Sequence, residues 1–259
     1  MLEYPAYVNK ELEFSTTVKK NDYGVRVKRI QEWLGLQGFG TPIDSDFGDA
    51  TKTCVTRFQQ KAGLGTSGAV DGDTWSALVA PMTKALAGID SPGSSLGSTV
   101  LRVAKQHLSQ SPVEIGGDNC GPWVRLYCGG NDGTEWKWCA GFVTFVMKQA
   151  CMILDRSTPF QGSYSCDSLA YQAKDKDLFV KGTDVADGTV DWGDLGTAQI
   201  FLVRRSPTDW SHTGFSFSGS DQTFSTIEGN TNDDGSANGY EVCKRLRSIS
   251  KKDLIRFPD

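Results

Sequence analysis

Residues 43–64 read IDSDFGDATKTCVTRFQQKAGL, and this pattern predicts a turn followed by an amphipathic helix. The turn is indicated by Asp, Ser and Gly, whose side chains and backbone freedom suit tight reversals of the chain. From Asp49 to Gln60, apolar residues return at helical spacing and form one stripe. Cys54 lies on this stripe, where we expect it to pack as a small apolar side chain.

Similar segments lie on both sides of this one. Upstream, residues 27–34 (VKRIQEWL) place Val, Ile, Trp and Leu at helical spacing. Downstream, residues 68–78 (GAVDGDTWSAL) repeat the Asp/Gly turn and lead into a third helix. We expect Asp73 to cap this helix and Pro81 to end it. The first third of the chain is therefore predicted to be a small all-α domain of three helices.

This series of segments resembles the three-helix peptidoglycan-binding domain that accompanies many cell-wall hydrolases. The family pattern combines a DG-x-FG-x-x-T turn, an FQ helix and a DG-x-x-TW-x-x-L ending, and it is matched over about residues 18–82. Ser45 stands where the family usually has Gly. The resemblance implies a domain at residues 1–82, with its core at about 18–82, that binds bacterial peptidoglycan.

The composition changes after this domain. Residues 85–98 (ALAGIDSPGSSLGS) are rich in Gly and Ser, which is typical of a flexible linker, so we place a linker at 83–98. Beyond it, helices are predicted at 100–108 and after Trp138. Short alternating segments then predict strands near 199–204, 213–217, 223–227 and 240–246. Helices followed by strands indicate an α+β domain with an antiparallel sheet at 99–259.

The segment WKWCAGFVTFVMKQA, residues 136–150, carries the candidate nucleophile. Its apolar residues follow helical spacing from about Cys139 onward. A thiol at a helix N-terminus meets the positive end of the helix dipole and unpaired N–H groups, and both favour the reactive thiolate. Ala140 and Gly141 leave room for a substrate carbonyl beside those N–H groups, which would stabilise an oxyanion. The alternative is a buried structural cysteine that opens an apolar helix.

A cysteine nucleophile needs a base, and the chain has two histidines. His107 lies on an apparent helix face, where we expect it to be solvated. His212, in DWSHTGFSF, enters a strand, and the next strand, FSTIEGN, carries Glu228 and Asn230. Two residues apart, these side chains share one face of an extended strand, and a hairpin would bring them beside the imidazole. A third polar group of this kind orients a catalytic base, although each residue taken singly also has a structural explanation.

The pieces WCAGFV, SHTGF and IEGN, in this order, resemble the CHAP family of cysteine amidohydrolases and peptidases, which is related to the NlpC/P60 proteins and is papain-like in fold. The resemblance covers roughly residues 99–259, except for 154–191, which match nothing we can place. Ser211 stands where the family often has Gly or another small residue. Cys120 lacks a following apolar helix, so it is a weaker candidate nucleophile. Position by position, the resemblance implies a nucleophile, a general base, an orienting acid and a further polar member of the site: Cys139, His212, Glu228 and Asn230.

Together, the two resemblances imply a peptidoglycan hydrolase that cleaves an amide bond. We expect an N-acetylmuramoyl-L-alanine amidase. The loops around Trp123, Trp136 and Trp210, together with the unmatched residues 154–191, are expected to form the pocket walls. A peptidoglycan endopeptidase that cuts the stem peptide or cross-link uses the same acyl-transfer chemistry and stays open. A wall-binding protein whose cysteine domain has lost activity is the second alternative.

Composition argues against other classes of protein. The chain has 27 basic and 31 acidic side chains, and its net charge of −4 includes no long run of either sign. Because nucleic-acid binding normally needs a clustered basic face, we expect no nucleic-acid partner. Two histidines at unrelated spacings and no CxxC pair make a poor zinc site, so no metal or other cofactor is expected. The oxygen-rich run 232–239 lacks the closing Glu of an EF-hand loop and is interpreted as a turn.

The termini and apolar runs bear on location. No stretch approaches the roughly 18 apolar residues of a membrane span, and the opening MLEYPAYVNK lacks the features of a signal peptide. We therefore expect a monomer made in the cytoplasm that acts in the periplasm or cell wall. Holin-dependent release, as for a phage endolysin, or injection by secretion machinery, as for an antibacterial effector, would deliver it there.

Overall fold

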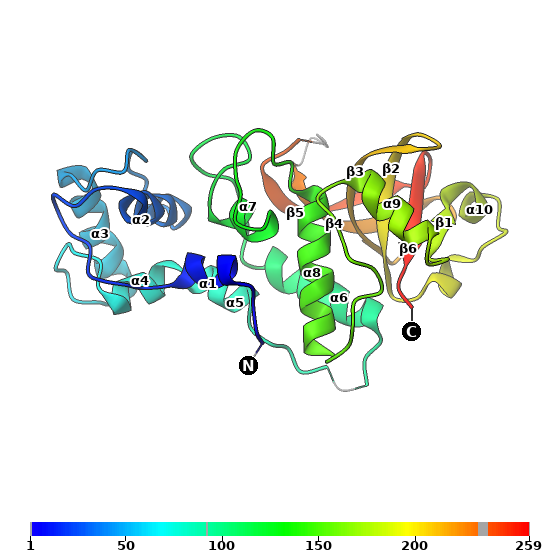
Figure 1. Ribbon diagram of the computed structural model, residues 1–259, viewed down its shortest axis with the longest axis horizontal. Helices are drawn as coiled ribbons and strands as arrows, with labels where there is room; N and C mark the ends of the chain where they lie inside the picture. Colours follow the sequence, from blue (N-terminus) through cyan, green and yellow to red (C-terminus); the bar gives the residue numbers. More distant parts are fainter. Residues whose placement is uncertain (1, 92, 233–237, 259) are drawn as a thin grey trace. The chain divides into compact units, whose positions relative to one another are not determined.

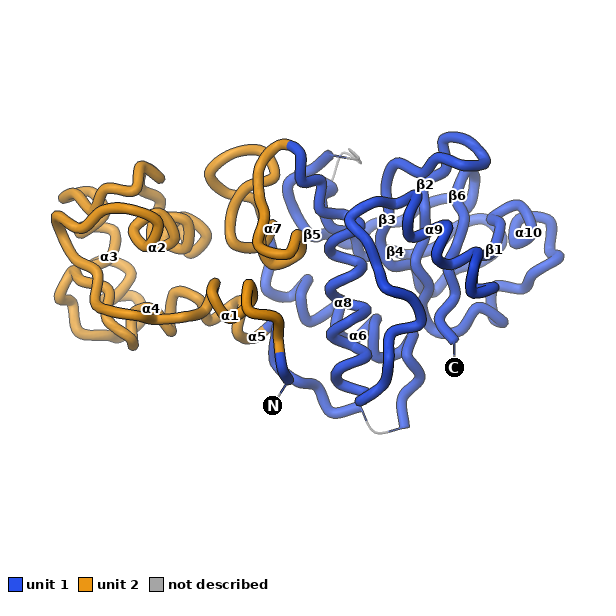
Figure 2. The backbone as a smooth tube through the Cα atoms, viewed as in Figure 1, with its two compact units in different colours: residues 1–3, 85–112, 135–259 blue, residues 4–84, 113–134 orange. Residues whose placement is uncertain are grey.

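The computed structural model describes residues 2–91, 93–232 and 238–258 (Figure 1). Its contacts divide the chain into two compact units (Figure 2). The helical unit comprises residues 4–84 and 113–134, and the sheet unit comprises residues 1–3, 85–112 and 135–259. The run 232–239 was predicted to form a turn. Its residues 233–237 lie outside the described residues.

The helical unit contains the helices predicted from the sequence. They are α2 (Val25–Leu36), α3 (Asp49–Ala62) and α4 (Gly72–Leu78). Their apolar stripes are buried, and Trp33 of α2 and Val55 of α3 are fully inaccessible to solvent. The count of three helices predicted for residues 1–82 is too low, because α1 (Ala6–Leu12) and the start of α5 (Ala80–Ala85) also lie there. The helix α7 (Pro122–Tyr127) joins this unit from a later part of the chain.

Two buried glutamines hold the repeated turns. Gln31 of α2 accepts a hydrogen bond from the N–H of Ser45 at 2.9 Å, and Gln59 of α3 accepts one from the N–H of Gly68, also at 2.9 Å. Both turn residues have a positive φ, 67° at Ser45 and 71° at Gly68. This region favours glycine, which explains why the family usually has Gly where this chain has Ser45.

Two details at the end of α4 differ from the prediction. Asp71 caps the helix, not Asp73, because the Asp71 carboxylate accepts a hydrogen bond from the N–H of Thr74 at 2.9 Å. Pro81 does not stop the chain from being helical, because α5 begins at Ala80. Proline is tolerated there, since the first turn of a helix leaves its N–H groups without intrahelical partners.

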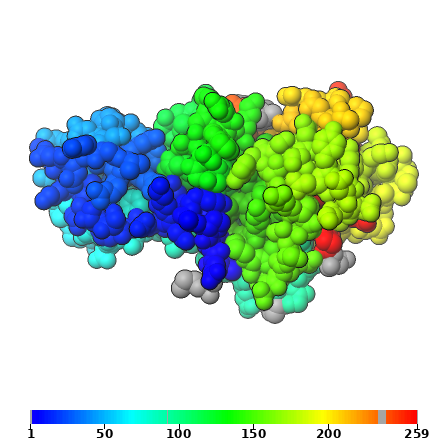
Figure 3. Space-filling view, viewed as in Figure 1, coloured from blue at the N-terminus to red at the C-terminus, as the bar shows by residue number. Residues whose placement is uncertain are grey.

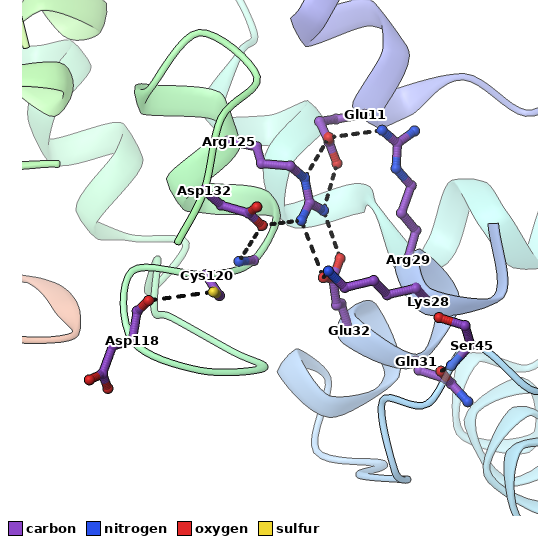
Figure 4. Close-up of polar contacts among 11 residues, drawn as sticks. Glu11, Lys28, Arg29, Gln31, Glu32, Ser45, Asp118, Cys120, Arg125 and Asp132 are labelled. Atoms are coloured by element: carbon purple, nitrogen blue, oxygen red, sulfur yellow. Dashed lines mark hydrogen bonds and ion pairs between the residues drawn. The ribbon is translucent and has the colours of Figure 1, made fainter. Parts of the chain in front are cut away.

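The segment 113–134 packs with the helical unit, whereas its sequence position placed it in the domain predicted at 99–259. The physical reason is a buried guanidinium on α7. Figure 4 shows Arg125 between carboxylates from α1, α2 and its own segment, with nitrogen–oxygen distances of 2.8 Å to Glu11, 2.6 Å to Glu32 and 2.8 Å to Asp132. Trp123 of the same helix lies edge-on to the Trp33 ring, with centroids 6.0 Å apart.

The sheet unit is built on one antiparallel sheet with the strand order β1-β6-β2-β3-β4-β5, which confirms the predicted antiparallel sheet. The four strands predicted from alternation are present, and two short strands were missed. The strands are β1 (Phe179–Lys181), β2 (Ala198–Ser206), β3 (Asp209–Phe217), β4 (Thr223–Thr231), β5 (Glu241–Ser248) and β6 (Lys252–Arg256).

Two helices pack against each other and against this sheet, α6 (Leu96–Leu108) and α8 (Cys139–Ile153) (Figure 1). The helix α6 begins three residues earlier than the predicted domain, because Ser95 caps it and Leu96 is buried. The last residues of the predicted linker are therefore helical. No helix in the described ranges is long and apolar enough to cross a membrane.

Residues 154–191, which had no counterpart in the resemblance, are folded into the sheet unit. They contribute α9 (Cys166–Lys174), β1 and α10 (Gly182–Ala186), and they are followed by a short 3-10 helix, η1 (Trp192–Leu195). The helix α9 contacts β3, and β1 pairs with β6. On the face shown in Figure 3, the lime-green part of the chain around α9 forms much of the surface of this unit.

Candidate active site

The helix α8 begins at Cys139, as predicted, and it carries the thiol at its first turn. The preceding residue, Trp138, makes no side-chain cap, so the first N–H groups of the helix are not occupied by such a cap. Cys139 retains 4% of its surface exposed. The helix approaches β4 closely at Gly229, where an added Cβ would lie 2.8 Å from the side chains of Trp138 and Phe142. The glycine of the IEGN motif is therefore required for α8 to reach the sheet.

His212 lies inside β3 rather than at a strand edge, and it is almost completely buried. Its Nε2 is 2.8 Å from a carboxylate oxygen of Glu228 on β4. The two strands pair in the predicted hairpin, with Phe215 opposite Ile227. Gly214 makes room for this contact, because a Cβ there would lie 2.9 Å from Cγ of Glu228. The glycine of the SHTGF motif thus accommodates the acid that bonds the histidine.

Glu228 takes one ring nitrogen of His212, and the imidazole also interacts with Cys139. Among the described residues, Nδ1 has no hydrogen-bond partner that meets normal geometry. Burial lowers the pKa of His212, but hydrogen bonding and charge from Cys139 and Glu228 outweigh burial and raise that pKa to about 9. The ring is therefore poised to share a proton between its free nitrogen and the thiol.

The Cys139 thiol is strongly acidified. Its pKa lies well below the ordinary value, first because of a hydrogen bond from Cys166, and then because of His212 and the N–H of Ala140. Burial acts in the opposite direction and is outweighed. A thiolate beside an imidazolium is the reactive arrangement that a cysteine nucleophile needs.

Glu228 is held from three sides, two of which the sequence did not reveal. Arg247 of β5 approaches one carboxylate oxygen with Nε at 2.7 Å and the other with Nη2 at 2.5 Å. The hydroxyl of Thr226 donates to the carboxylate at 2.5 Å. Burial raises the pKa of Glu228, but Arg247 and His212 lower it by a larger amount. The resulting pKa is about 2. The carboxylate is therefore ionised while it is fully buried.

Asn230 does not follow the geometry predicted for it. The register of β4 against β5 shifts between Glu228 and Thr231, and Asn230 itself has a φ of 55°. The strand is not extended at this point, so the argument that Glu228 and Asn230 share a face fails. Asn230 is fully buried. Its side-chain amide has no hydrogen-bond partner among the described residues, and so it does not bond His212.

A second thiol lies at the nucleophile. The Sγ atoms of Cys139 and Cys166 are 4.0 Å apart, and Cys166 is the first residue of α9. Its side chain is buried, and its pKa is raised well above the ordinary value, mainly by the bond to Cys139 and by burial. The sequence signal was Ser165 before Cys166, a capping residue ahead of a helix, in the segment that had no match.

The prediction that His107 is solvated is wrong. It is fully buried on α6, and its Nε2 is 2.9 Å from the side-chain oxygen of Gln149 on α8. Burial lowers the pKa of His107 to about 4, so the ring is neutral near pH 7. His107 therefore joins two helices of the core, and its position is distinct from that of His212.

The three predicted pocket tryptophans lie in different environments. Trp123 is a core residue of the helical unit and does not line the site. Trp210 is buried, with Nε1 donating to Asp253 at 2.8 Å and the Lys174 ammonium 4.6 Å from its ring centroid. Trp210 and Lys174 line a cavity of about 340 Å³. Trp136 is half-buried and packs edge-on against Tyr164, which is 48% exposed, so this pair presents aromatic surface to solvent.

Metal-binding residues do not cluster in the described part of the chain, where no three His, Cys, Asp or Glu side chains are placed to hold an ion. The polar groups brought together by the sheet unit are instead a thiol, an imidazole, a carboxylate and a guanidinium. These four support acyl transfer to a thiolate, with proton movement through the imidazole.

Comparison with known proteins adds two findings. Residues 23–78 of the helical unit match the family described as "Putative peptidoglycan binding domain". The chain is also similar to the crystal structure of the Burkholderia AP3 phage endolysin, at 27% sequence identity and a TM-score of 0.24. That similarity covers 40% of this chain and 40% of the endolysin chain, less than half of either. No curated protein matches the chain.

The match at 23–78 confirms the expectation of a peptidoglycan-binding domain in the N-terminal part of the chain. The chain thus combines a domain of this class with an α+β unit whose cysteine, histidine and glutamate converge. Peptidoglycan is accordingly the partner indicated for the helical unit.

Proposed function

We propose that this protein is a peptidoglycan hydrolase that cleaves an amide bond with Cys139 as nucleophile and His212 as general base. The observation that carries the proposal is the chain of contacts from the acidified Cys139 thiol through His212 to Glu228, with 2.8 Å between the last two. The peptidoglycan-binding match at residues 23–78 supports the substrate class. The resemblance to CHAP and other papain-like cysteine hydrolases supports the same chemistry.

The reaction begins when the Cys139 thiolate attacks the carbonyl carbon of the amide. The carbonyl oxygen becomes negatively charged, and the N–H groups of the first turn of α8 stabilise it. The His212 imidazolium gives its proton to the leaving nitrogen, which departs as an amine and leaves a thioester on Cys139. His212 then takes a proton from water, whose oxygen attacks the thioester and releases the carboxylic acid.

Glu228 stays ionised and orients the imidazole during this cycle. Its bond to Nε2 fixes the ring so that Nδ1 is the nitrogen that exchanges protons with Cys139 and the leaving group. We assign Asn230 a secondary role as a polar group of the site, in keeping with its complete burial beside the bulge.

Within this class we favour an N-acetylmuramoyl-L-alanine amidase over an endopeptidase. The half-buried Trp136 precedes α8 by a few residues and packs edge-on against the exposed Tyr164, and aromatic faces suit stacking on sugar rings. A sugar-linked amide is the bond that such a surface would select. Delivery as a phage-type endolysin or as an injected effector, and action as a monomer, remain part of this proposal.

The test is digestion of purified peptidoglycan followed by mass spectrometry of the products. An amidase releases stem peptides that begin with L-alanine and leaves the sugar chains intact. Uncrosslinked or shortened stems still attached to sugars would identify an endopeptidase instead. Cys139→Ala should lose on the order of 10³-fold or more of the rate. Cys151→Ala, on the same helix and also buried, is the matched control and should retain activity.

If neither the wild type nor any variant releases products, while the protein still pellets with insoluble peptidoglycan, the alternative of an inactive wall-binding protein is correct. The complete set of Cys139, His212 and Glu228 argues against that alternative, because an unused site is free to lose its members. The buried Glu228 with its dedicated arginine adds to this argument.

A further inference from the structure

The first residues of two helices, Cys139 of α8 and Cys166 of α9, bring their sulfur atoms to 4.0 Å. We propose that this pair is an oxidative modification site, at which an oxidant of the hydroperoxide class joins Cys139 and Cys166 in a reversible disulfide that blocks the nucleophile. The loss of activity rests on the proposed function, whereas the disulfide itself does not.

The two sulfur atoms need to move only a short distance to form a disulfide. A disulfide bond is about 2.05 Å long, so the two sulfur atoms must approach by about 2 Å. Each sulfur stands at a helix N-terminus, where the chain has not yet entered the rigid interior of the helix. The start of α9 is anchored to the strand that carries His212, because the N–H of Trp210 donates to Asp167 at 2.6 Å. Cys166 is thereby held beside Cys139.

The two thiols have unequal acidity, which sets the order of events. Cys139 is the stronger acid, because Cys166, His212 and the N–H of Ala140 all stabilise its thiolate. Cys166 faces Cys139 and its own neighbour Asp167, whose negative charges keep its proton in place. Oxidation therefore begins at Cys139, and Cys166 acts second, as a thiol that resolves the oxidised intermediate.

The atoms balance in two steps. In the first, the Cys139 sulfur attacks one peroxide oxygen, the O–O bond breaks, hydroxide leaves, and a sulfenic acid forms. In the second, Cys166 loses its proton to that hydroxide, and its sulfur attacks the sulfur of Cys139. The S–S bond forms as the S–O bond breaks, and the departing hydroxide takes a proton from the His212 imidazolium to become water. The two thiols supply the two electrons that reduce the peroxide.

The remaining cysteines provide a contrast. Cys151 lies in the last turn of the same helix α8, and burial raises the pKa of its thiol to about 11. It is therefore a poor reactant toward peroxide, although its burial is similar to that of Cys139. This makes Cys151→Ser a matched control for the substitution of Cys166.

The first experiment treats the full chain with hydrogen peroxide, quenches free thiols with iodoacetamide, and maps peptides without reduction. We expect a peptide pair that joins Cys139 to Cys166, with the mass of two hydrogens lost, and its disappearance after dithiothreitol. The Cys151→Ser variant should give the same cross-link. If Cys139 is oxidised and no peptide joins it to Cys166, the proposal is overturned. This outcome is decided with the wild-type chain alone.

The second experiment compares wild type with Cys166→Ser. After peroxide, wild-type clearing of peptidoglycan should fall at least tenfold and return with dithiothreitol. In Cys166→Ser, Cys139 should gain two or three oxygen atoms, and dithiothreitol should not restore clearing. Full recovery in Cys166→Ser would refute the inference. A mapped disulfide in a protein that never clears peptidoglycan, even when reduced, would refute the proposed function and leave the modification site standing.

Discussion

The guanidinium of Arg247 donates a hydrogen bond to each oxygen of the Glu228 carboxylate, with Nε 2.7 Å from one and Nη2 2.5 Å from the other. The two residues come from neighbouring strands, β4 and β5. The acid is completely buried, whereas the Arg247 side chain retains 16% exposure. A bidentate pair of this kind fixes the carboxylate in orientation as well as in charge. It leaves the same carboxylate positioned to accept the hydrogen bond from His212.

Replacing Arg247 with alanine should therefore damage both stability and catalysis. The variant keeps Glu228 buried without its strongest partner, and breaking such a pair costs on the order of 3–5 kcal/mol of the free energy of unfolding. Urea denaturation measures that loss. The pKa of Glu228 should rise toward its ordinary value. As the pH is lowered, the folded variant should therefore lose activity at a higher pH than the wild type does.

Arg247→Lys and Arg205→Ala sharpen this test. Lysine restores the charge but not the two-pronged geometry, so its activity should lie between those of wild type and Arg247→Ala. Arg205 is an exposed arginine on β2, and its removal should leave both stability and rate close to wild type. An Arg247→Ala enzyme with an unchanged pH profile would show that the arginine does not act through Glu228.

The dependence of activity on pH follows from the paired shifts of Cys139 and His212. The pKa of Cys139 is well below the ordinary value, and that of His212 is raised to about 9. The thiolate–imidazolium pair therefore persists between those two limits, and the rate should decline as pH rises through about 9, where the proton for the leaving nitrogen is lost. Initial rates of peptidoglycan clearing over pH measure this limb.

The same shifts predict how stability varies with pH. The folded pKa of His212, about 9, exceeds its ordinary value of 6.5, so its stabilising contribution is complete below 6.5 and disappears as pH rises through 9. The folded pKa of Glu228, about 2, is below its ordinary value of 4.5, so its contribution is present above 4.5 and disappears as pH falls through 2. In His212→Ala the alkaline loss should vanish and the pKa of Cys139 alkylation by iodoacetamide should rise.

Substitution of the other histidine separates structure from chemistry. His107→Ala removes a fully buried ring and leaves Gln149 without that partner, which should lower the free energy of unfolding by about 2–4 kcal/mol. The rate per folded molecule should remain near wild type, because His107 bonds Gln149 in the second half of α8 and makes no hydrogen bond to Cys139. Thermal unfolding combined with active-site titration by iodoacetamide measures the two effects. A loss of rate in fully folded His107→Ala would contradict this assignment.

Much of the sheet unit was predictable from the sequence because local patterns carry it. Helical spacing after Trp138 placed the start of α8 at Cys139, and alternation placed β3 and β4 with His212 and Glu228 on paired strands. These features depend on neighbours within a few residues, where backbone periodicity determines which side chains meet.

The residues that were missed depend on contacts distant in the chain. Arg247 and Cys166 join the site only through the pairing of β4 with β5 and the packing of α9 on β3. Asn230 was placed incorrectly because a bulge breaks the alternation on which its prediction relied. Cysteine and arginine on short amphipathic elements have no periodic signature that distinguishes a site residue from a surface residue.

The boundary between the units provides the last prediction, because it too depends on a distant contact. Arg125, in the segment 113–134, is the cation between the buried carboxylates of Glu11 and Glu32. Arg125→Met should lower the free energy of unfolding of the helical unit by about 3–5 kcal/mol, since both acids lose their closest partner. Arg29 and Lys28 remain within 3.2 Å and 3.7 Å of these acids and offset part of the loss. Urea unfolding followed by tryptophan fluorescence reports the change, because Trp33 and Trp123 pack together beside the network. The double variant Arg125→Met/Glu32→Gln should recover part of the stability, and Arg26→Met, at an exposed position, should change little.

Pelleting with insoluble peptidoglycan should weaken in Arg125→Met under mild urea before the wild type loses binding. If the unfolding midpoint and the pelleting are both unchanged, the segment 113–134 does not support the peptidoglycan-binding domain, and the boundary predicted from the sequence is the correct one.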